Sequence, residues 1–180
     1  EKNTVFYTSP PQLPVENILD NLFVEGLALL ERSQFYQYEV SAFARDERYS
    51  RHNKNYWQFG DYLGIGAGAH GKITLANQQI IRRWKTRTPE DYLVKQDKVA
   101  GSQPIGRSEL ALEFMMNHLR VLEGFTKELF SQRTGLLFSD IEPKLIDLEK
   151  QELLEKVGPL YRPTAKGRLF LNNMIAYFDP

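Results

Sequence analysis

The sequence predicts a mixed α/β fold whose helices and strands fall into two parts. Residues 15–32 have the apolar spacing of an amphipathic helix, and residues 35–43 follow with the alternation of a strand. A helix followed by a strand is half of a β–α repeat, the unit that builds a (β/α) barrel. From residue 108 onward, helical patterns enclose one pair of short strands. We therefore predict two domains, at residues 1–100 and 101–180.

Composition limits the classes of partner. Lysine and arginine together number 23, as do aspartate and glutamate, so the net charge is zero. This balance argues against binding to bulk nucleic acid or to an anionic membrane. No apolar run approaches the ~20 residues of a transmembrane helix. Cysteine is absent, which excludes disulfides and thiolate metal sites. The chain begins without methionine or a signal peptide, and we interpret this as a cut within a longer protein.

The first elements lead toward a polar loop. Residues 1–14 are expected to be irregular because proline recurs among them. The helix that follows carries its apolar stripe on Ile18, Leu22, Gly26, Leu29 and Leu30. In the strand at 35–43, valine and alanine alternate with polar residues. Binding sites of barrels lie at the carboxyl ends of strands, and here Ala44 and Arg45 leave from that end.

The glycine-rich run at 60–71 is expected to feed a strand hairpin. Gly66 to Gly71 formally matches a dinucleotide fingerprint, but that motif must open a helix. Here strands are predicted at 72–75 and 79–84, so we reject a dinucleotide site. Five basic residues and no acidic ones lie between positions 72 and 87: Lys72, Arg82, Arg83, Lys85 and Arg87. A solvated face is the favoured interpretation, and pairing with ligand carboxylates is the alternative.

Residues 88–107 are rich in proline, glycine, serine and charge, with a short helix around Tyr92. This segment is the predicted domain boundary. Ser108 is expected to cap a helix that runs to about Leu122, and His118 on its apolar side is interpreted as structural.

The last 55 residues or so have the element order of a winged helix. Thr126 is expected to cap a helix that ends at Gly135, and either Ser139 or Asp140 to cap the next, with Pro143 at its fourth or third position. A turn at Gly158-Pro159 makes the wing, and Thr164 caps a final helix through Phe178. The helix at 140–150 carries four acidic residues against two lysines, which would repel DNA. A docking role is therefore favoured over DNA binding.

The stretch from residue 38 to 71 concentrates the groups that suit a flat ligand. It holds two of the three histidines, a tryptophan and five glycines. An imidazole can donate a lone pair to a metal, and aromatic rings supply flat apolar walls. His52 and Tyr56 are four residues apart, so either a helix or an extended strand places them on one face.

This stretch resembles the HemW family of radical-SAM-related heme chaperones, which are relatives of oxygen-independent coproporphyrinogen III oxidase (HemN). The resemblance rests on His-Asn-x-x-Tyr-Trp at 52–57, on the run from Gly60 to His70 and on Ser-Ala-Phe-Ala-Arg at 41–45. Thr-Ala-Lys-Gly at 164–167 is similar to the HemN-type carboxyl-terminal domain. The resemblance as a whole implies the carboxyl-terminal end of a partial (β/α) radical-SAM barrel, followed by a winged-helix-like domain.

The resemblance also implies ligands. His52 would be an axial ligand of heme iron, Asn53 would orient its imidazole, and Tyr56 and Trp57 would line the site. Whether Tyr56 is a second iron ligand or a packing residue stays open. Ala44 would contact S-adenosylmethionine. Proteins of this family hold a [4Fe–4S] cluster with cysteines, none of which this chain has, so the chain alone is not expected to be active.

The favoured function is a heme chaperone, cytoplasmic or peripheral to the inner membrane, that delivers heme to respiratory membrane proteins. One alternative is oxidative decarboxylation of coproporphyrinogen III, and another is a non-catalytic interaction module. Porphyrin propionates would suit the arginines of the hairpin. His70 is interpreted as a buried structural imidazole.

Overall fold

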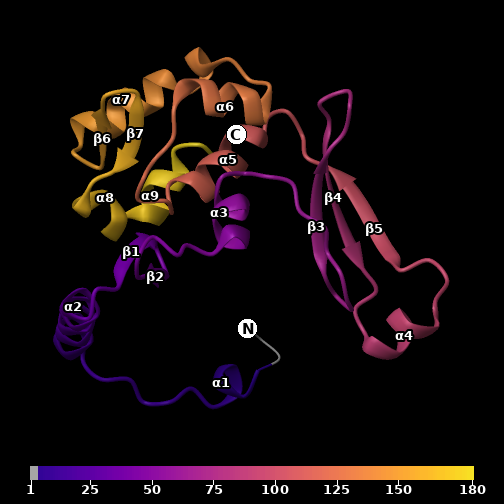
Figure 1. Ribbon diagram of the computed structural model, residues 1–180, viewed down its shortest axis with the longest axis horizontal. Helices are drawn as coiled ribbons and strands as arrows, with labels where there is room; N and C mark the ends of the chain where they lie inside the picture. The colour runs from indigo at the N-terminus through magenta and orange to yellow at the C-terminus, as the bar shows by residue number, and fades with distance from the viewer. Residues whose placement is uncertain (1–3) are drawn as a thin grey trace.

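The computed structural model describes residues 4–180 (Figure 1). The amino-terminal elements are α1 (Val5–Thr8) and α2 (Glu16–Arg32), joined by an irregular segment. The short helix α1 was not expected, and the irregular backbone expected at residues 1–3 lies outside the described residues. Within 4–180, no helix is both long and apolar enough to cross a membrane.

Helix α2 forms where the apolar spacing predicts it. Glu16 lies in its first turn and Arg32 in its last, so both charges complement the helix dipole. None of its 17 residues is buried. The apolar stripe therefore has no covering layer within the described chain.

The single strand predicted at 35–43 is wrong in detail. The segment folds back as an antiparallel hairpin of β1 (Tyr36–Glu39) and β2 (Ala42–Ala44). The buried Glu39 side chain accepts a hydrogen bond from the backbone N–H of Ser41 at 3.1 Å, which closes the turn. The N–H of Val40 donates to the carbonyl of Arg120 at 2.9 Å. These bonds occupy the backbone at the point where one long strand would have to continue.

Next come α3 (Arg51–Trp57) and a three-stranded antiparallel sheet in the order β3-β4-β5. Its strands are β3 (His70–Thr74), β4 (Ile80–Lys85) and β5 (Val99–Pro104), with α4 (Pro89–Val94) between the last two. The sheet stands on the side of the molecule away from α2, with α3 between them (Figure 1). The hairpin and α4 confirm the sequence predictions.

Strand β5 was not predicted. Its sequence, Val-Ala-Gly-Ser-Gln-Pro, lacks apolar alternation, and pairing with β4 decides its conformation. The pairing runs from Ile81 opposite Pro104 to Lys85 opposite Val99. The division into domains 1–100 and 101–180 stays a prediction, with β5 lying across it.

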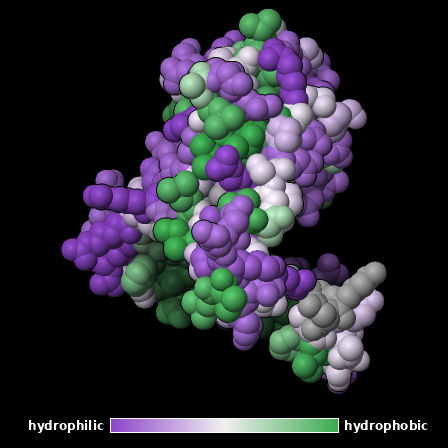
Figure 2. Space-filling model, turned by 90° about the vertical axis from the view of Figure 1, so that its right-hand side faces the viewer, coloured by the Kyte–Doolittle hydropathy of each residue, from purple (hydrophilic) through white to green (hydrophobic). Residues whose placement is uncertain are grey.

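The carboxyl-terminal part holds most of the core. Its elements are α5 (Leu110–His118), α6 (Lys127–Thr134), the 3₁₀ turn η1 (Phe138–Asp140), α7 (Glu142–Lys150), β6 (Leu154–Val157), β7 (Leu160–Pro163), α8 (Ala165–Leu169) and α9 (Leu171–Ala176). Phe114, on α5, is in edge-to-face contact with the rings of Phe59, Phe125 and Phe130. The chain therefore closes one aromatic core around α5. On the face shown in Figure 2, hydrophobic residues are interspersed with hydrophilic ones.

The predicted turn chemistry of this part is largely confirmed. The Thr126 hydroxyl accepts from the N–H of Leu129, and the Thr164 hydroxyl accepts from the N–H of Gly167. Gly135 and Gly158 both have positive φ, at the end of α6 and in the β6–β7 turn.

Three boundaries differ from the prediction. Helix α5 starts after Glu109 without a Ser108 cap and ends at His118, because Val121 turns away to pair with Glu39. Helix α7 begins so late that Pro143 lies in its first two positions, where proline is best tolerated. The final helix breaks at Phe170, and the second piece, α9, turns Leu171 and Met174 into the core.

Candidate functional site

Helix α3 carries the histidine and aromatic residues that the sequence singled out. Ser50 caps it, because its hydroxyl accepts from the backbone N–H of Asn53 at 3.2 Å. At 100° per residue, His52 and Tyr56 share one face, while Lys54 points to the other. Lys54 forms an ion pair with Glu123 at 3.2 Å. The helix is thus held on one side and presents His52 on the other.

His52 is exposed, and within residues 4–180 its ring has no hydrogen bond, ion pair or ring contact. Tyr56 is half-buried, with its ring centroid 4.8 Å from that of Trp57 and 5.3 Å from that of Tyr62. The Arg120 guanidinium lies 5.4 Å from the Trp57 ring. An accessible imidazole therefore stands on the same helix face as a tyrosine that belongs to an aromatic group.

Within residues 4–180, Asn53 has no hydrogen bond to the His52 imidazole. Its side-chain oxygen accepts from the Ser50 hydroxyl at 3.2 Å, so it takes part in the cap of α3. The role predicted for it at the histidine has no contact behind it in the described chain.

His70 also differs from its interpretation as a buried imidazole. It is exposed at the start of β3, and its ring lies nearly parallel to Trp84 at 6.4 Å. His118, by contrast, is fully buried in the core, as expected. Its ring stacks on Phe114 at 4.2 Å, and burial lowers its pKa to about 3.

The basic hairpin is not uniformly a solvated face. Arg82 pairs with Glu113, and burial raises the pKa of that carboxyl against the lowering effect of Arg82. Lys72 is buried. Arg83 and Lys85 line a small hollow of ≈ 90 Å³ beside Leu63. The five basic residues therefore divide between structural pairs and an open surface.

The carboxyl end of α3 is tied to β3. The Asn55 side chain donates to the carbonyl of Asp61 at 2.8 Å. The Asp61 carboxylate accepts from the backbone N–H and from the hydroxyl of Thr74, both at 2.9 Å. Helix α3 and the sheet therefore share one hydrogen-bonded junction.

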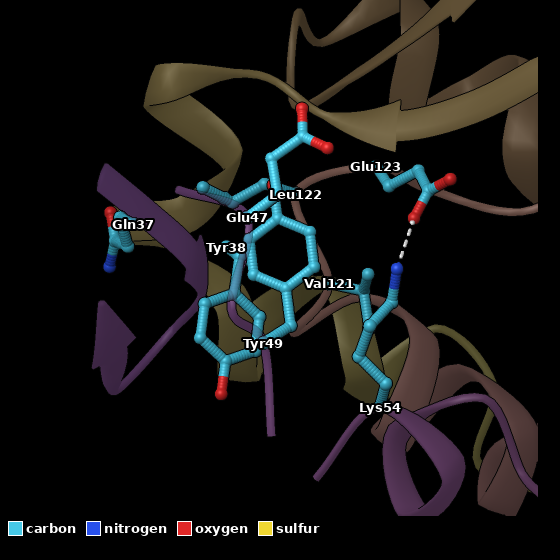
Figure 3. A pocket seen from close by; sticks show the side chains of 8 residues that line it. All are labelled: Gln37, Tyr38, Glu47, Tyr49, Lys54, Val121, Leu122 and Glu123. Carbon is cyan, nitrogen blue, oxygen red and sulfur yellow. Dashed lines mark hydrogen bonds and ion pairs between the residues drawn. The ribbon is translucent and has the colours of Figure 1, made fainter. Parts of the chain in front are cut away.

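Larger hollows lie on the Lys54 side of α3. One of ≈ 490 Å³ is lined by residues of β1, of the loop before α3, of α3 itself and of the turn after α5: Gln37, Tyr38, Glu47, Tyr49, Lys54, Val121, Leu122 and Glu123 (Figure 3). The Tyr38 and Tyr49 ring centroids are 4.7 Å apart, and the Lys54–Glu123 pair crosses its edge. His52 and Tyr56 do not line this hollow.

Ala44 lies at a second hollow, of ≈ 510 Å³, next to the first. Tyr36, Glu47 and Tyr49 line it as well, and Ala44 itself is buried on β2. Glu47 and its neighbour Asp46 both have positive φ, which is costly for side chains other than glycine. The loop that leaves β2 is thus bent sharply between Ala44 and α3.

The donor groups of this chain include an exposed imidazole but no thiolate. The exposed imidazole of His52 could supply one axial nitrogen, and a porphyrin brings the other ligands of its iron. Among the described residues, no three histidine, cysteine or acidic side chains group to hold a metal ion. Because the sequence has no cysteine, this chain cannot ligate a [4Fe–4S] cluster.

Sequence reasoning missed several residues around α3. Glu47 and Tyr49 come from the loop before α3 and Arg120 from the turn after α5, while Lys72 was grouped with surface cations. The alternation of β3 gives no hint of its burial, because it puts Lys72 on the same side as the polar residues His70 and Thr74. Nothing in the spacing shows that this side is covered.

Comparisons with known proteins place the chain. Residues 106–170 match the family described as the HemN C-terminal domain. Over 99% of its length the chain is 38% identical to the heme chaperone HemW of Escherichia coli K12, covering 47% of that relative. It is 36% identical to HemW of Haemophilus influenzae, again over 99% of the chain and covering 46% of the relative. The chain thus spans about half the length of the curated relatives it matches.

A solved structure gives the fold. The chain superposes on coproporphyrinogen III oxidase (HemN) of Escherichia coli, described as a radical SAM enzyme, with a TM-score of 0.65. The two are 18% identical, and the match covers 93% of this chain and 42% of that one. This likeness confirms the predicted fold class, and the HemW relatives confirm the resemblance seen in the sequence.

Proposed function

We propose, from the likeness of nearly its whole length to HemW proteins, that this chain is the heme-binding part of a heme chaperone. The observation that carries the proposal is the exposed imidazole of His52, which has no partner within residues 4–180, on a capped helix that is fixed to the body of the protein. The names of the relatives support the identity of the ligand.

In this proposal His52 donates a ring nitrogen to heme iron, and Tyr56 offers part of its ring beside it. Trp57 supports Tyr56 through an edge contact, with ring centroids 4.8 Å apart, and the Arg120 guanidinium in turn lies over the Trp57 ring. The ring contacts of Tyr56 with Trp57 and Tyr62 favour a packing role over iron ligation. Asn53 contributes through the cap of α3.

An exposed single ligand suits a protein that must release its cargo. An iron held between two protein ligands in a closed pocket would exchange slowly, whereas an open face lets an acceptor approach. We infer that the acceptor is a respiratory membrane protein. S-adenosylmethionine, near Ala44, and a [4Fe–4S] cluster would be held only with residues outside this chain.

Heme titration of the 180-residue chain tests the proposal. His52→Ala should shift or remove the Soret band and weaken heme binding about tenfold or more. His70→Ala is the matched control, since it removes the other exposed imidazole and should leave the spectrum unchanged. Equal spectra and affinities for the His52→Ala variant and the parent chain would exclude His52 as the ligand.

A second measurement separates chaperone from oxidase. The complete protein, with its cluster reconstituted, is supplied with heme and an apo-acceptor or with coproporphyrinogen III. Transfer of heme without decarboxylation is the expected outcome. Decarboxylation of coproporphyrinogen III would favour the oxidase instead, and neither reaction would leave an interaction module.

A further inference from the structure

Lys72 is a buried cation at the junction between α3 and the sheet. It lies on β3 opposite Arg82, and only 2% of its surface is exposed. A lysine in the interior needs partners for its ammonium group, because removing a charge from water is costly. Here those partners all come from the segment that follows α3.

The ammonium group makes three contacts with that segment. It donates to the backbone carbonyl of Phe59 at 2.9 Å and lies 3.8 Å from the centroid of the Phe59 ring. Asp61 is its counter-charge, with a carboxylate oxygen 3.6 Å from the Lys72 nitrogen. The Lys72 nitrogen therefore contacts a carbonyl, an aromatic ring and a carboxylate that lie within three residues of one another in the chain.

Phe59 is the residue that turns the chain away from α3. Its φ is 56°, a left-handed conformation that a residue with a side chain adopts only when its surroundings hold it there. The Phe59 ring is buried against Phe114 of the core, with centroids 6.0 Å apart. The Lys72 ammonium group, through its contacts with the Phe59 carbonyl and ring, helps to stabilise this backbone conformation.

The same junction fixes the direction of α3. The backbone N–H of Gly60 donates to the carbonyl of Asn55, and Asn55 donates to Asp61. Tyr62, two residues beyond Gly60, pairs with Lys72 through the backbone and contacts Tyr56 through its ring. A loss of the Lys72 charge would loosen the end of the helix on which His52 and Tyr56 stand.

We propose that Lys72 is a positioning residue whose ammonium group fixes the face of α3 that carries His52 and Tyr56. This inference rests on the proposed function for its effect on heme, and on the junction alone for its effect on α3. Lys72 touches neither imidazole nor ligand, so it acts through Phe59, Asp61 and Tyr62.

The charges around Lys72 give the junction a pH dependence. Burial lowers the pKa of its ammonium group, and Asp61 opposes that shift, while Arg133 of α6 and Arg82 of β4 add to it. Glu113 of α5 also interacts with Lys72 electrostatically. The group should therefore lose its proton below the ordinary range of lysine, and with it the ion pair and the attraction to the Phe59 ring.

Trp57 fluorescence tests the Lys72 clamp, meaning the contacts of its ammonium group with Phe59 and Asp61, without heme. In a Trp84→Phe background Trp57 is the one tryptophan of the sequence. We expect its emission to change in an alkaline transition that disappears in Lys72→Met. Asp61→Asn should move the transition to lower pH, because it removes the opposing carboxylate. Lys95→Met, at an exposed lysine of the α4 end, should change nothing.

Heme affinity then tests the positioning role. At pH 7, Lys72→Met should weaken heme binding about tenfold, the order seen when groups behind a metal ligand are removed. In a His52→Ala background the same substitution should add no further loss of heme affinity. Lys72 is proposed to affect heme only by positioning His52, and that contact is already absent there. Asp61→Asn gives a second route, since it leaves Lys72 in place, and should weaken binding less.

Each outcome decides a separate point. An unchanged alkaline transition in Lys72→Met overturns the clamp, whatever heme does. An equal loss of affinity with and without His52 makes Lys72 a general structural residue and overturns the positioning role. Unchanged heme binding by His52→Ala alone defeats the proposed function, yet leaves the fluorescence test of the clamp intact. If Lys72→Met fails to fold, the direction of the Asp61→Asn shift decides.

Discussion

Helix α2 and the aromatic core around α5 are built from similar residues but differ in burial. Both carry stripes of leucine and phenylalanine at helical spacing. In α2 no residue is buried, and Leu22 is 60% exposed. In α5, Phe114 and Met115 are both 0% exposed, closed in by α6, α9 and the segment after α3. The difference teaches that an amphipathic pattern makes a helix but does not supply the layer that covers it.

The largest expected effect comes from cutting into the core. Phe114→Ala should lower the free energy of unfolding by about 4 kcal/mol, because four rings lose their contact with it. Leu22→Ala on α2 should change it by less than about 0.5 kcal/mol. Urea denaturation followed by circular dichroism measures both. Similar losses for the two variants would mean that α2 is buried in solution.

Acid should weaken the core through His118. Its pKa is about 3 in the folded chain and near the ordinary 6.5 when unfolded, so the unfolded state binds the proton more readily. The contribution of neutral His118 to the free energy of unfolding is therefore fully present above pH 6.5. It is lost as the pH drops toward 3, which lowers the free energy of unfolding by roughly 3 kcal/mol at pH 4. Denaturation across this range measures the slope.

His118→Leu is the control for the acid effect. This variant keeps an apolar group of similar size between Phe114 and Phe125 and cannot take up a proton. Its stability should vary less between pH 6.5 and 4 than that of the parent chain. An identical slope would assign the acid sensitivity to the carboxylates instead.

The smallest contrast concerns helix caps in covered and uncovered places. Thr126→Ala removes the acceptor for the N–H of Leu129 in α6, which is packed on α5, and should cost about 1 kcal/mol of global stability. Thr88→Ala removes the equivalent cap of α4, a helix without buried residues. Its loss should show only as faster hydrogen exchange within α4. A global loss from Thr88→Ala would show that α4 is coupled to the core.

The sequence alone determined the elements whose signals are local. The apolar period fixed α2, the turn at 76–78 fixed the β3–β4 hairpin, and threonine and glycine fixed both ends of α6. The motif at 52–57 also indicated the likeness to HemW proteins, because such a likeness depends on residue identity. These features depend on neighbours a few positions apart in the chain.

Tertiary structure alone decided what faces what. It broke the strand expected at 35–43, because Glu39 pairs with Val121, and it recruited the poorly patterned β5 through β4. It exposed His70, buried Lys72 beneath the end of α3 and left the imidazole of His52 open. Burial depends on segments far apart in sequence that come together only on folding, and no local pattern records which of them will meet.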